Sequence, residues 1–284
     1  MIPNKTYSEE LHRGFGTTFE ADEIYFESET DHQRIVVFKN SIFGRMMMLD
    51  GVTQTTEADE FIYHEMLSHT PILAHGNALK VLIIGGGDGG MLREVLRHPG
   101  VEKCTMVEID NSVVELSKQY LPNHSQGAFD DPRANLVFGD GAAFVLDPDD
   151  RYDVMIVDST DPIGPGEVLF QDNFYANTRN CLNPDGILVT QNGVPFLQAD
   201  ELRNSMTHLK QFYSDVSCYL ATIPTYVGGP MAFGWASNTE AHRKIDIGIL
   251  EQRFSKLGIQ TRYYTPTVHM GAFALPPYIS DLIE

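Results

Sequence analysis

The sequence has few cysteines, few basic residues and no apolar run long enough to cross a bilayer. Its three cysteines, Cys104, Cys181 and Cys218, belong to no CxxC or Cys/His cluster, so neither a disulfide framework nor a metal site is expected. Lys and Arg number 20 against 39 Asp and Glu, a net charge of −19, which argues against nucleic acid or an anionic membrane as a partner. The N-terminus, MIPNKTYSEE, shows no basic segment followed by an apolar one. A cytoplasmic protein with reduced thiols is therefore expected.

The pattern of apolar residues changes near residue 70 and predicts two domains. Short strand-like runs, with Asp50-Gly51 as a strong hairpin signal, predict a small antiparallel β-domain over residues 1–70. A helix is expected at 57–73. Beyond it, strands alternate with helices, so residues 71–284 are expected to form an α/β, Rossmann-like domain with a doubly wound, mainly parallel sheet. The expected strands lie at 25–26, 34–38, 46–49, 52–55, 79–84, 103–109, 135–138, 152–157, 186–191, 216–222 and 231–236, and the later helices at 91–97, 113–120, 141–146, 172–181 and 199–212.

Acidic residues stand where the strands of the wound domain are expected to end. Ligands of a doubly wound sheet bind outside the carboxyl ends of its strands, so these carboxylates should line one crevice. A crevice lined by acids suits a nucleoside that carries positive charge better than it suits a phosphate. The five acids are Asp88, Glu108, Asp140, Asp158 and Asp161.

The glycine-rich turn Gly85-Gly86-Gly87-Asp88-Gly89-Gly90 matches the GxGxxG pattern of dinucleotide sites, and Glu108 follows at the distance of a ribose-binding acid. However, a pyrophosphate would sit at the start of the following helix, where Asp88 places a carboxylate. A ligand with a ribose, an adenine and a cationic centre, such as a derivative of S-adenosylmethionine, avoids this conflict. The alternative is a tight turn without a ligand.

Two acids of the crevice suit an adenosine. Glu108 can accept hydrogen bonds from both ribose hydroxyls. Asp140 can accept one from the exocyclic amine of adenine, while Gly141 lets the base approach the backbone. The alternative for either acid is a helix N-cap, where Asp is favoured.

The segment DSTDPIGP after the fourth strand of the wound domain contains Asp158 and Asp161 in a loop stiffened by Pro162 and Pro165. Two fixed carboxylates beside the adenosine site would hold ammonium groups. A loop rich in Pro and Gly could also be only a turn.

Together, GGGDGG, VEID, the acid-glycine pair, DSTDPIGP and LDGVTQTTEADEFIYHEM resemble the polyamine aminopropyltransferases, the family of the bacterial spermidine synthases. The resemblance extends from about His12 to the terminal ALPPY. It implies a small N-terminal β-domain on a methyltransferase-like Rossmann domain, usually in a homodimer. It also implies a reaction, in which an aminopropyl group moves from decarboxylated S-adenosylmethionine to putrescine and gives spermidine and methylthioadenosine.

The resemblance assigns roles to residues whose numbers can be read from this sequence. His64 lies on the expected helix at 57–73, so an ordinary core or surface histidine is the alternative for it. Relatives of the human type have an acid in the segment QNGVPF, at 191–196, which leaves the site for the acceptor's far amine open. The implied nucleoside contacts are Gln33, Gln54, Glu108, Asp140, Gly141 and Pro165; the implied polyamine or aminopropyl contacts are Tyr63, His64, Asp88, Asp158, Ser159, Thr160, Asp161 and Tyr226, with Gln191 as a further lining residue.

The chemistry requires a base, because an alkyl amine resembles lysine, with a pKa near 10.4, and is protonated at neutral pH. Asp158 is the expected proton acceptor, its pKa raised by Asp88 and Asp161. The freed nitrogen then displaces the thioether directly, with no covalent intermediate, metal or cofactor, since the donor is a co-substrate. Asp88 would also repel the α-carboxylate of ordinary S-adenosylmethionine.

Other functions fit parts of the pattern. An aminopropyltransferase with another acceptor, such as cadaverine or agmatine, shares the same features. A small-molecule methyltransferase usually binds the methionine carboxylate and would gain nothing from Asp88, which also disfavours a dinucleotide oxidoreductase. A non-catalytic polyamine-binding protein would not need the adenosine pocket.

Overall fold

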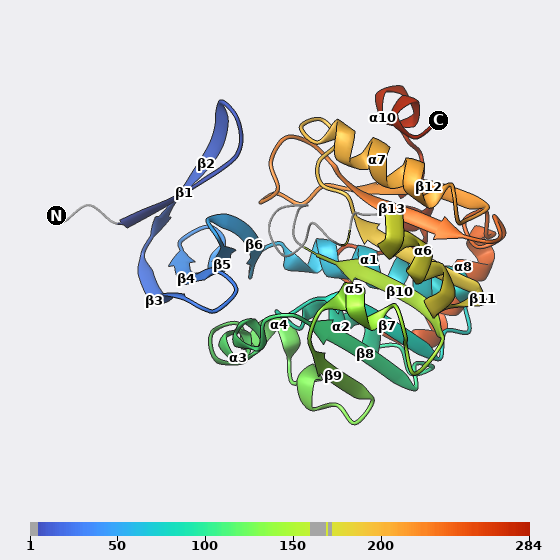
Figure 1. Cartoon of the computed structure of the whole chain (residues 1–284), viewed down its shortest axis with the longest axis horizontal. Helices are drawn as coiled ribbons and strands as arrows, with labels where there is room; N and C mark the ends of the chain where they lie inside the picture. The colour runs from blue at the N-terminus through green and yellow to red at the C-terminus, as the bar shows by residue number, and fades with distance from the viewer. Residues whose placement is uncertain (1–4, 160–168, 170–171) are drawn as a thin grey trace.

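A seven-stranded sheet forms the centre of the larger part of the molecule in a computed structural model that describes residues 5–159, 169 and 172–284 (Figure 1). The strand order is β12-β13-β11-β10-β7-β8-β9. All pairs are parallel except those of β13, which runs antiparallel to β11 and β12. The expected α/β fold with a mainly parallel wound sheet is confirmed. The strands are β7 (Lys80–Gly85), β8 (Lys103–Glu108), β9 (Ala134–Phe138), β10 (Tyr152–Asp158), β11 (Leu182–Gln191), β12 (Asp215–Ala221) and β13 (Met231–Ser237).

Helices cover both faces of this sheet, so its central strands contain runs of consecutive apolar residues. On β10, Val154 and Ile156 pack into the core on one face, and Met155 and Val157 pack into the core on the other. Burial on both sides explains the continuous apolar run that marks this strand in the sequence. The first face carries α1 (Glu60–His75), α2 (Gly90–Leu96), α8 (Ile247–Leu257) and α9 (Pro266–Ala272), and the second carries α5 (Gly141–Phe144), α6 (Asp172–Cys181), α7 (Ala199–Leu209) and α10 (Pro277–Ile283).

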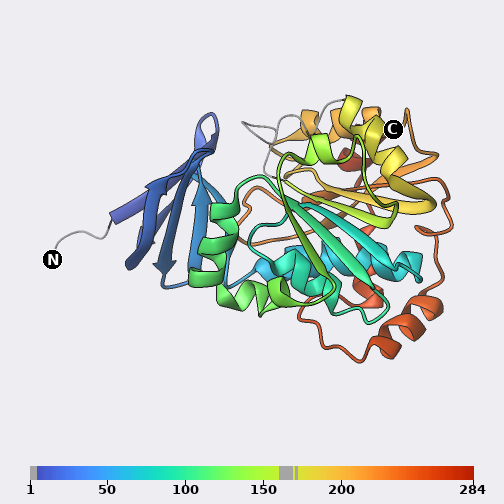
Figure 2. The ribbon, with the colours of Figure 1, turned by 60° about the horizontal axis from the view of Figure 1, so that its bottom comes forward.

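The N-terminal part consists of a four-stranded antiparallel sheet and a separate hairpin (Figure 2). Asp50 and Gly51 both have positive φ, 50° and 83°, as a two-residue hairpin turn requires. The sheet was expected, but the hairpin was not, because its residues are mostly polar and exposed. The sheet contains β3 (Glu23–Glu29), β4 (Arg34–Asn40), β5 (Gly44–Leu49) and β6 (Val52–Thr56), and the hairpin contains β1 (Lys5–His12) and β2 (Phe15–Ala21).

Both faces of the four-stranded sheet are covered, and one cover comes from the larger part of the molecule. Val36 and Phe38 pack against Tyr7 and Phe19 of the hairpin. On the opposite face, Ile35, Val37 and Met47 pack against Val113 and Leu121 at the two ends of α3 (Asn111–Tyr120). This helix therefore joins the small sheet to the Rossmann-like part.

The remaining elements are α4 (Pro122–Ser125) and the 3₁₀ helix η1 (Ala128–Asp130), which follow α3. Helix α1 crosses residue 70 and packs into the core of the large sheet, and the division at residue 70 stays a prediction. Cys104, Cys181 and Cys218 are buried free thiols. No helix in the described ranges combines the length and the apolar character needed to cross a membrane.

Candidate active site

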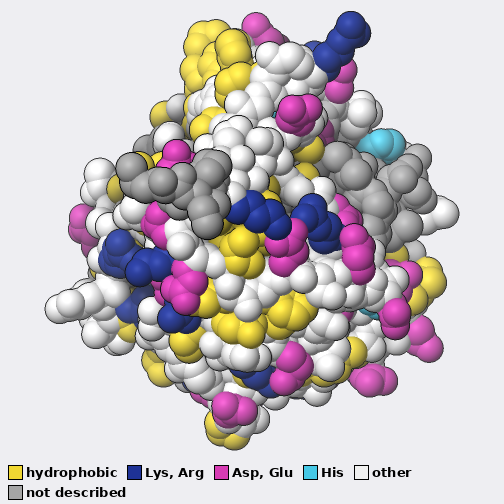
Figure 3. Space-filling view, turned by 90° about the vertical axis from the view of Figure 1, so that its left-hand side faces the viewer, with side chains coloured by type: hydrophobic (Ala, Val, Ile, Leu, Met, Phe, Trp, Pro, Cys, Tyr) yellow, Lys and Arg dark blue, Asp and Glu magenta, His cyan; other side chains and the backbone are white. Residues whose placement is uncertain are grey.

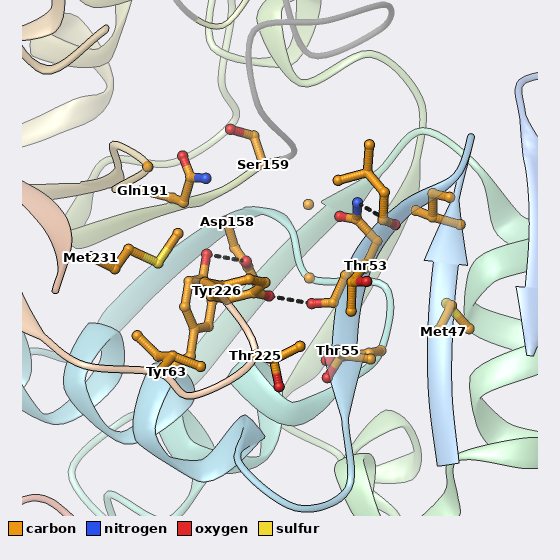
Figure 4. A pocket seen from close by; sticks show the side chains of 18 of the residues that line it. Met47, Thr53, Thr55, Tyr63, Asp158, Ser159, Gln191, Thr225, Tyr226 and Met231 are labelled. Atoms are coloured by element: carbon orange, nitrogen blue, oxygen red, sulfur yellow. Dashed lines mark hydrogen bonds between the residues drawn. The ribbon is translucent and has the colours of Figure 1, made fainter. Parts of the chain in front are cut away.

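A cavity lies outside the carboxyl ends of β7, β8 and β10, and β6 and the hairpin β1–β2 complete its wall (Figure 4). Thr160, Asp161 and Pro165 lie outside the described residues. All the other residues that the sequence analysis singled out for binding line this cavity: Gln33, Gln54, Tyr63, His64, Asp88, Glu108, Asp140, Gly141, Asp158, Ser159, Gln191 and Tyr226.

Asp158, at the end of β10, is bound to Tyr63 of α1. The Tyr63 hydroxyl donates a hydrogen bond of 2.7 Å to Asp158 Oδ1 (Figure 4). Burial raises the pKa of Asp158 to about 6, with a further contribution from Asp88 and an opposing one from the charge of His64. The expected rise in pKa is thus present, but its main cause is burial rather than the neighbouring acids. A carboxylic acid with a pKa close to neutrality can accept and release protons under physiological conditions.

His64 points into the cavity and links two carboxylates. Its Nδ1 donates to Glu60 Oε2 at 2.5 Å, and its Nε2 lies 3.5 Å from Asp88 Oδ2. Burial lowers the pKa of His64, but Asp88 and Glu60 outweigh it and raise the pKa to about 9. The ring is therefore an imidazolium at neutral pH. It is buried, as the alternative of a core histidine supposed, and it also lines the cavity. Sequence reasoning did not single out Glu60, whose only signal is its position four residues before His64 on the helix.

Asp88 occupies the start of α2. Its Oδ1 accepts a hydrogen bond of 2.7 Å from the backbone N–H of Gly90, which lies in the first turn of the helix. The carboxylate thus fills the position that a pyrophosphate would need, as the sequence analysis argued.

The glycine turn before Asp88 also contacts β10. Gly85 and Gly86 have positive φ, 88° and 80°. A Cβ on Gly85 would lie 2.0 Å from the carbonyl oxygen of Asp158. Glycine is therefore required at position 85 both by the backbone conformation and by the approach of the next strand.

Glu108, at the end of β8, is buried, and burial raises its pKa to about 7. Its Oε1 accepts the backbone N–H of Asp110 at 3.0 Å, while a Cβ on Gly87 would lie 2.8 Å from Oε2. A ribose held by both oxygens, as expected from the sequence, would share Oε1 with that N–H.

Asp140 and Gly141 follow β9 and begin α5. Asp140 Oδ1 accepts a hydrogen bond of 2.8 Å from the backbone N–H of Ala142. Asp140 is therefore the N-cap of α5, which was the alternative for this residue, and it also lines the cavity. A Cβ on Gly141 would lie 2.4 Å from Ile84 Cγ2 of β7. Glycine at position 141 is thus needed for the packing of α5 on the sheet, in addition to any need for an adenine base to approach the backbone.

Residues of the small sheet and of the later loops close the cavity. Gln33 Nε2 donates to Asp110 Oδ2 at 3.1 Å. The Tyr226 hydroxyl donates to the carbonyl oxygen of Gln54, and the rings of Tyr226 and Tyr63 lie 6.2 Å apart (Figure 4). Gln191 ends β11 on the side of Met231. The cavity therefore has an acidic floor at the strand ends and an aromatic wall.

Comparisons with known proteins match most of the chain. The family model "Spermine/spermidine synthase domain" matches residues 60–246, and "Spermidine synthase tetramerisation domain" matches residues 6–57. A polyamine aminopropyltransferase of Ruegeria sp. is 59% identical over 97% of both chains, and polyamine aminopropyltransferase 1 of Pseudomonas aeruginosa is 58% identical over 98% of this chain and 97% of its own.

Two solved structures are also similar. A spermidine synthase in complex with the transition-state analogue AdoDATO has a TM-score of 0.93 and 36% identity, with 98% of this chain and 94% of that chain covered. The spermidine synthase of Thermotoga maritima has a TM-score of 0.90 and 35% identity, with the same coverage. The chain belongs to the spermine/spermidine synthase family and is an aminopropyltransferase.

Proposed function

We propose that this chain transfers an aminopropyl group from decarboxylated S-adenosylmethionine to putrescine and releases spermidine and methylthioadenosine. The observation that carries the proposal is the hydrogen bond from Tyr63 to Asp158, whose carboxyl group has a pKa of about 6. Further acids line the same cavity. A similar spermidine synthase binds the transition-state analogue AdoDATO.

The donor would lie along the carboxyl ends of β7, β8 and β9. Glu108 would hold the ribose through Oε2 and, in part, Oε1, and Asp140 with Gly141 would border the adenine. Asp88 would then face the cationic aminopropyl chain. An α-carboxylate on the donor would meet Asp88 instead, which favours the decarboxylated molecule over ordinary S-adenosylmethionine.

The acceptor amine would approach Asp158. The protonated amine of the acceptor transfers a proton to the Asp158 carboxylate, and the neutral nitrogen then attacks the CH₂ bound to the sulfonium. The C–N bond forms as the C–S bond breaks, and the bonding electron pair leaves with sulfur as a neutral thioether. A lysine-like amine costs about 5 kcal/mol to deprotonate at neutral pH, so a base held next to it and the positioning of both cations supply much of the acceleration.

The aromatic wall suits the methylene chain of a diamine. Tyr63 and Tyr226 offer ring surface, and Gln191 stands at the end of β11. Cadaverine and agmatine, which differ in length and in the far group, are the alternative acceptors.

The proposal is tested by incubating the protein with decarboxylated S-adenosylmethionine and a panel of amines, and by weighing the products. Spermidine should be the main product, and Asp158→Asn should lower turnover by about 10²-fold or more while methylthioadenosine still binds in a calorimetric titration. If a different amine gave a higher kcat/KM, that amine would replace putrescine as the proposed acceptor. Near-normal turnover of Asp158→Asn would mean that another residue is the base.

We also propose that the chain self-associates. Figure 3 shows the N-terminal end of the molecule, where hydrophobic side chains are exposed among mixed charges; Ile24 and Ile42 are exposed on this part of the chain. The tetramerisation model matches the same residues, 6–57. Sedimentation equilibrium would distinguish the expected homodimer from a tetramer. Three buried thiols fit the cytoplasmic location that the sequence suggested.

A further inference from the structure

A row of alternating charges leads away from the cavity behind His64. Asp88 lies beside His64, His64 is bound to Glu60, and Glu60 is bound to Arg93 of α2. The side chains of His64, Glu60 and Arg93 are 4%, 9% and 9% exposed. Buried charges of this kind persist only where each has a partner, so the row forms a unit in which each member fixes the next.

Arg93 is held firmly at the far end of the row. Its NH1 donates to the carbonyl oxygen of His124 at 2.5 Å and to that of Asn123 at 3.2 Å. Its Nε donates to Glu94 Oε1 at 2.8 Å. The guanidinium then contacts both oxygens of Glu60, at 3.2 Å and 2.9 Å. Because the guanidinium binds both oxygens, the Glu60 carboxylate is restricted to one orientation.

The orientation of Glu60 decides which nitrogen of His64 faces the cavity. Nδ1 donates to Glu60, and Nε2 therefore points toward Asp88. The rings of Tyr63 and His124 also pack near the His64 ring, with centroids 5.5 and 6.4 Å away, and the charges of Arg93 and Asp158 act on it as well. Asp88 is held on its other side by the N–H of Gly90.

We propose that Glu60 is a positioning residue, which orients the His64 ring and, through it, the carboxylate of Asp88 toward the cationic chain of the bound substrate. Glu60 takes no part in the proton transfer. This inference rests on the proposed function, since it needs a cationic aminopropyl chain beside Asp88.

The test compares Glu60→Gln with Glu65→Gln. Glu65 is a buried carboxylate on the same helix, and it accepts backbone N–H groups of Arg262, Tyr263 and Tyr264, whereas Glu60 bonds to His64 and Arg93. Glu60→Gln should raise the KM for decarboxylated S-adenosylmethionine about tenfold, the usual effect of a lost charge-assisted hydrogen bond, with a smaller change in kcat. Glu65→Gln should leave KM unchanged and lower the thermal stability.

A double-mutant cycle with His64→Asn shows whether Glu60 acts through His64. Glu60→Gln should have no further effect on KM in the His64→Asn background. In the wild type, NMR of ¹⁵N-labelled histidine should show a His64 ring protonated on both nitrogens at neutral pH, and Glu60→Gln should lower its pKa.

Three results would overturn the inference: an unchanged KM in Glu60→Gln, an equal rise in Glu65→Gln, or additive effects in the cycle. Failure of the proposed function would look different, because the wild type would then transfer no aminopropyl group to any amine, while the NMR signal of His64 would still report on Glu60.

Discussion

At the scale of single residues, the protein surroundings give chemically identical carboxylates different protonation behaviour. Burial raises the pKa of Asp158 to about 6 and that of Glu108 to about 7. Burial also opposes ionisation of Glu60, but His64 and Arg93 outweigh it and lower its pKa to about 2. At neutral pH Glu60 is thus a fixed anion, whereas Asp158 and Glu108 lie close to their titration points. Of these two, Asp158 is the one that the proposed reaction uses for proton transfer, because a base with a pKa near the working pH is the effective one.

Tyr63→Phe should shift the acid limb of the rate profile to higher pH. The base form of Asp158 is the active form, so kcat should rise as pH increases through about 6 in the wild type. The Tyr63 hydroxyl stabilises the ionised carboxylate, and its removal raises the pKa of Asp158. Rates of product formation between pH 5 and 9 check this, and an unshifted limb would show that Asp158 does not control it.

Glu108→Gln should stabilise the protein without ligand. Because folding raises the pKa of Glu108 above its ordinary value of 4.5, the folded state binds the proton more tightly. This contribution to stability is complete below pH 4.5 and is lost as pH rises through about 7. At pH 8 the variant should gain up to about 3 kcal/mol in urea unfolding and should bind methylthioadenosine more weakly. Equal stability at pH 8 would contradict the assignment.

The sequence predicts many of these residues but not their connections. Asp88, Glu108, Asp140 and Asp158 could be identified because each follows an apolar strand, and parallel strands end at one edge. Glu60 could not, because its role depends on Arg93, which is 33 positions away and comes into contact only when α1 packs on α2.

At the scale of elements, the turn between β7 and α2 depends on its contact with β10. Gly85 has a positive φ, and the carbonyl oxygen of Asp158 in β10 lies close to the position that a Cβ on Gly85 would occupy. The alternating strands and helices around this turn were predicted correctly from apolar periodicity. Hairpin β1–β2 and helix α8 were not predicted, although α8 has an apolar face on which Leu250 is fully buried and Phe254 and Leu257 pack against the core.

Gly85→Ala should destabilise the fold by about 2–4 kcal/mol, from backbone strain and from the clash with Asp158. Gly100→Ala is the matched control, because nothing lies within 4 Å of its Cβ position and its φ lies outside the left-handed range. Thermal unfolding of both variants measures the difference. Equal melting temperatures would mean that β10 can move away without cost.

At the scale of the whole molecule, the cavity depends on two packing units that α3 joins. Ile35, Val37 and Met47 of the small sheet pack on Val113 and Leu121 around α3, while β6 and the hairpin line the cavity. The sequence predicts each unit from local patterns, but it does not predict this contact, since apolar residues alone do not specify which surfaces meet. The net charge of −19 surrounds the assembled site with a field that attracts cations.

Added salt should therefore weaken capture of the amine. Between 0.02 and 0.5 M NaCl we expect kcat/KM for the diamine to fall several-fold, while kcat changes little, because screening acts on the approach of the charged substrate. Initial rates at each salt concentration check this. A kcat that falls in parallel with kcat/KM would show that salt acts on the reacting complex instead.

The three cysteine side chains lie in the hydrophobic core, and burial raises the pKa of Cys181 and Cys218 to about 12 and that of Cys104 further. Thiolate reagents such as maleimides should therefore spare the native chain. A single cysteine introduced on the exposed surface of the hairpin would then be the one site of dye attachment. Movements of the N-terminal unit against the Rossmann-like core could thus be followed by fluorescence without first removing the natural thiols.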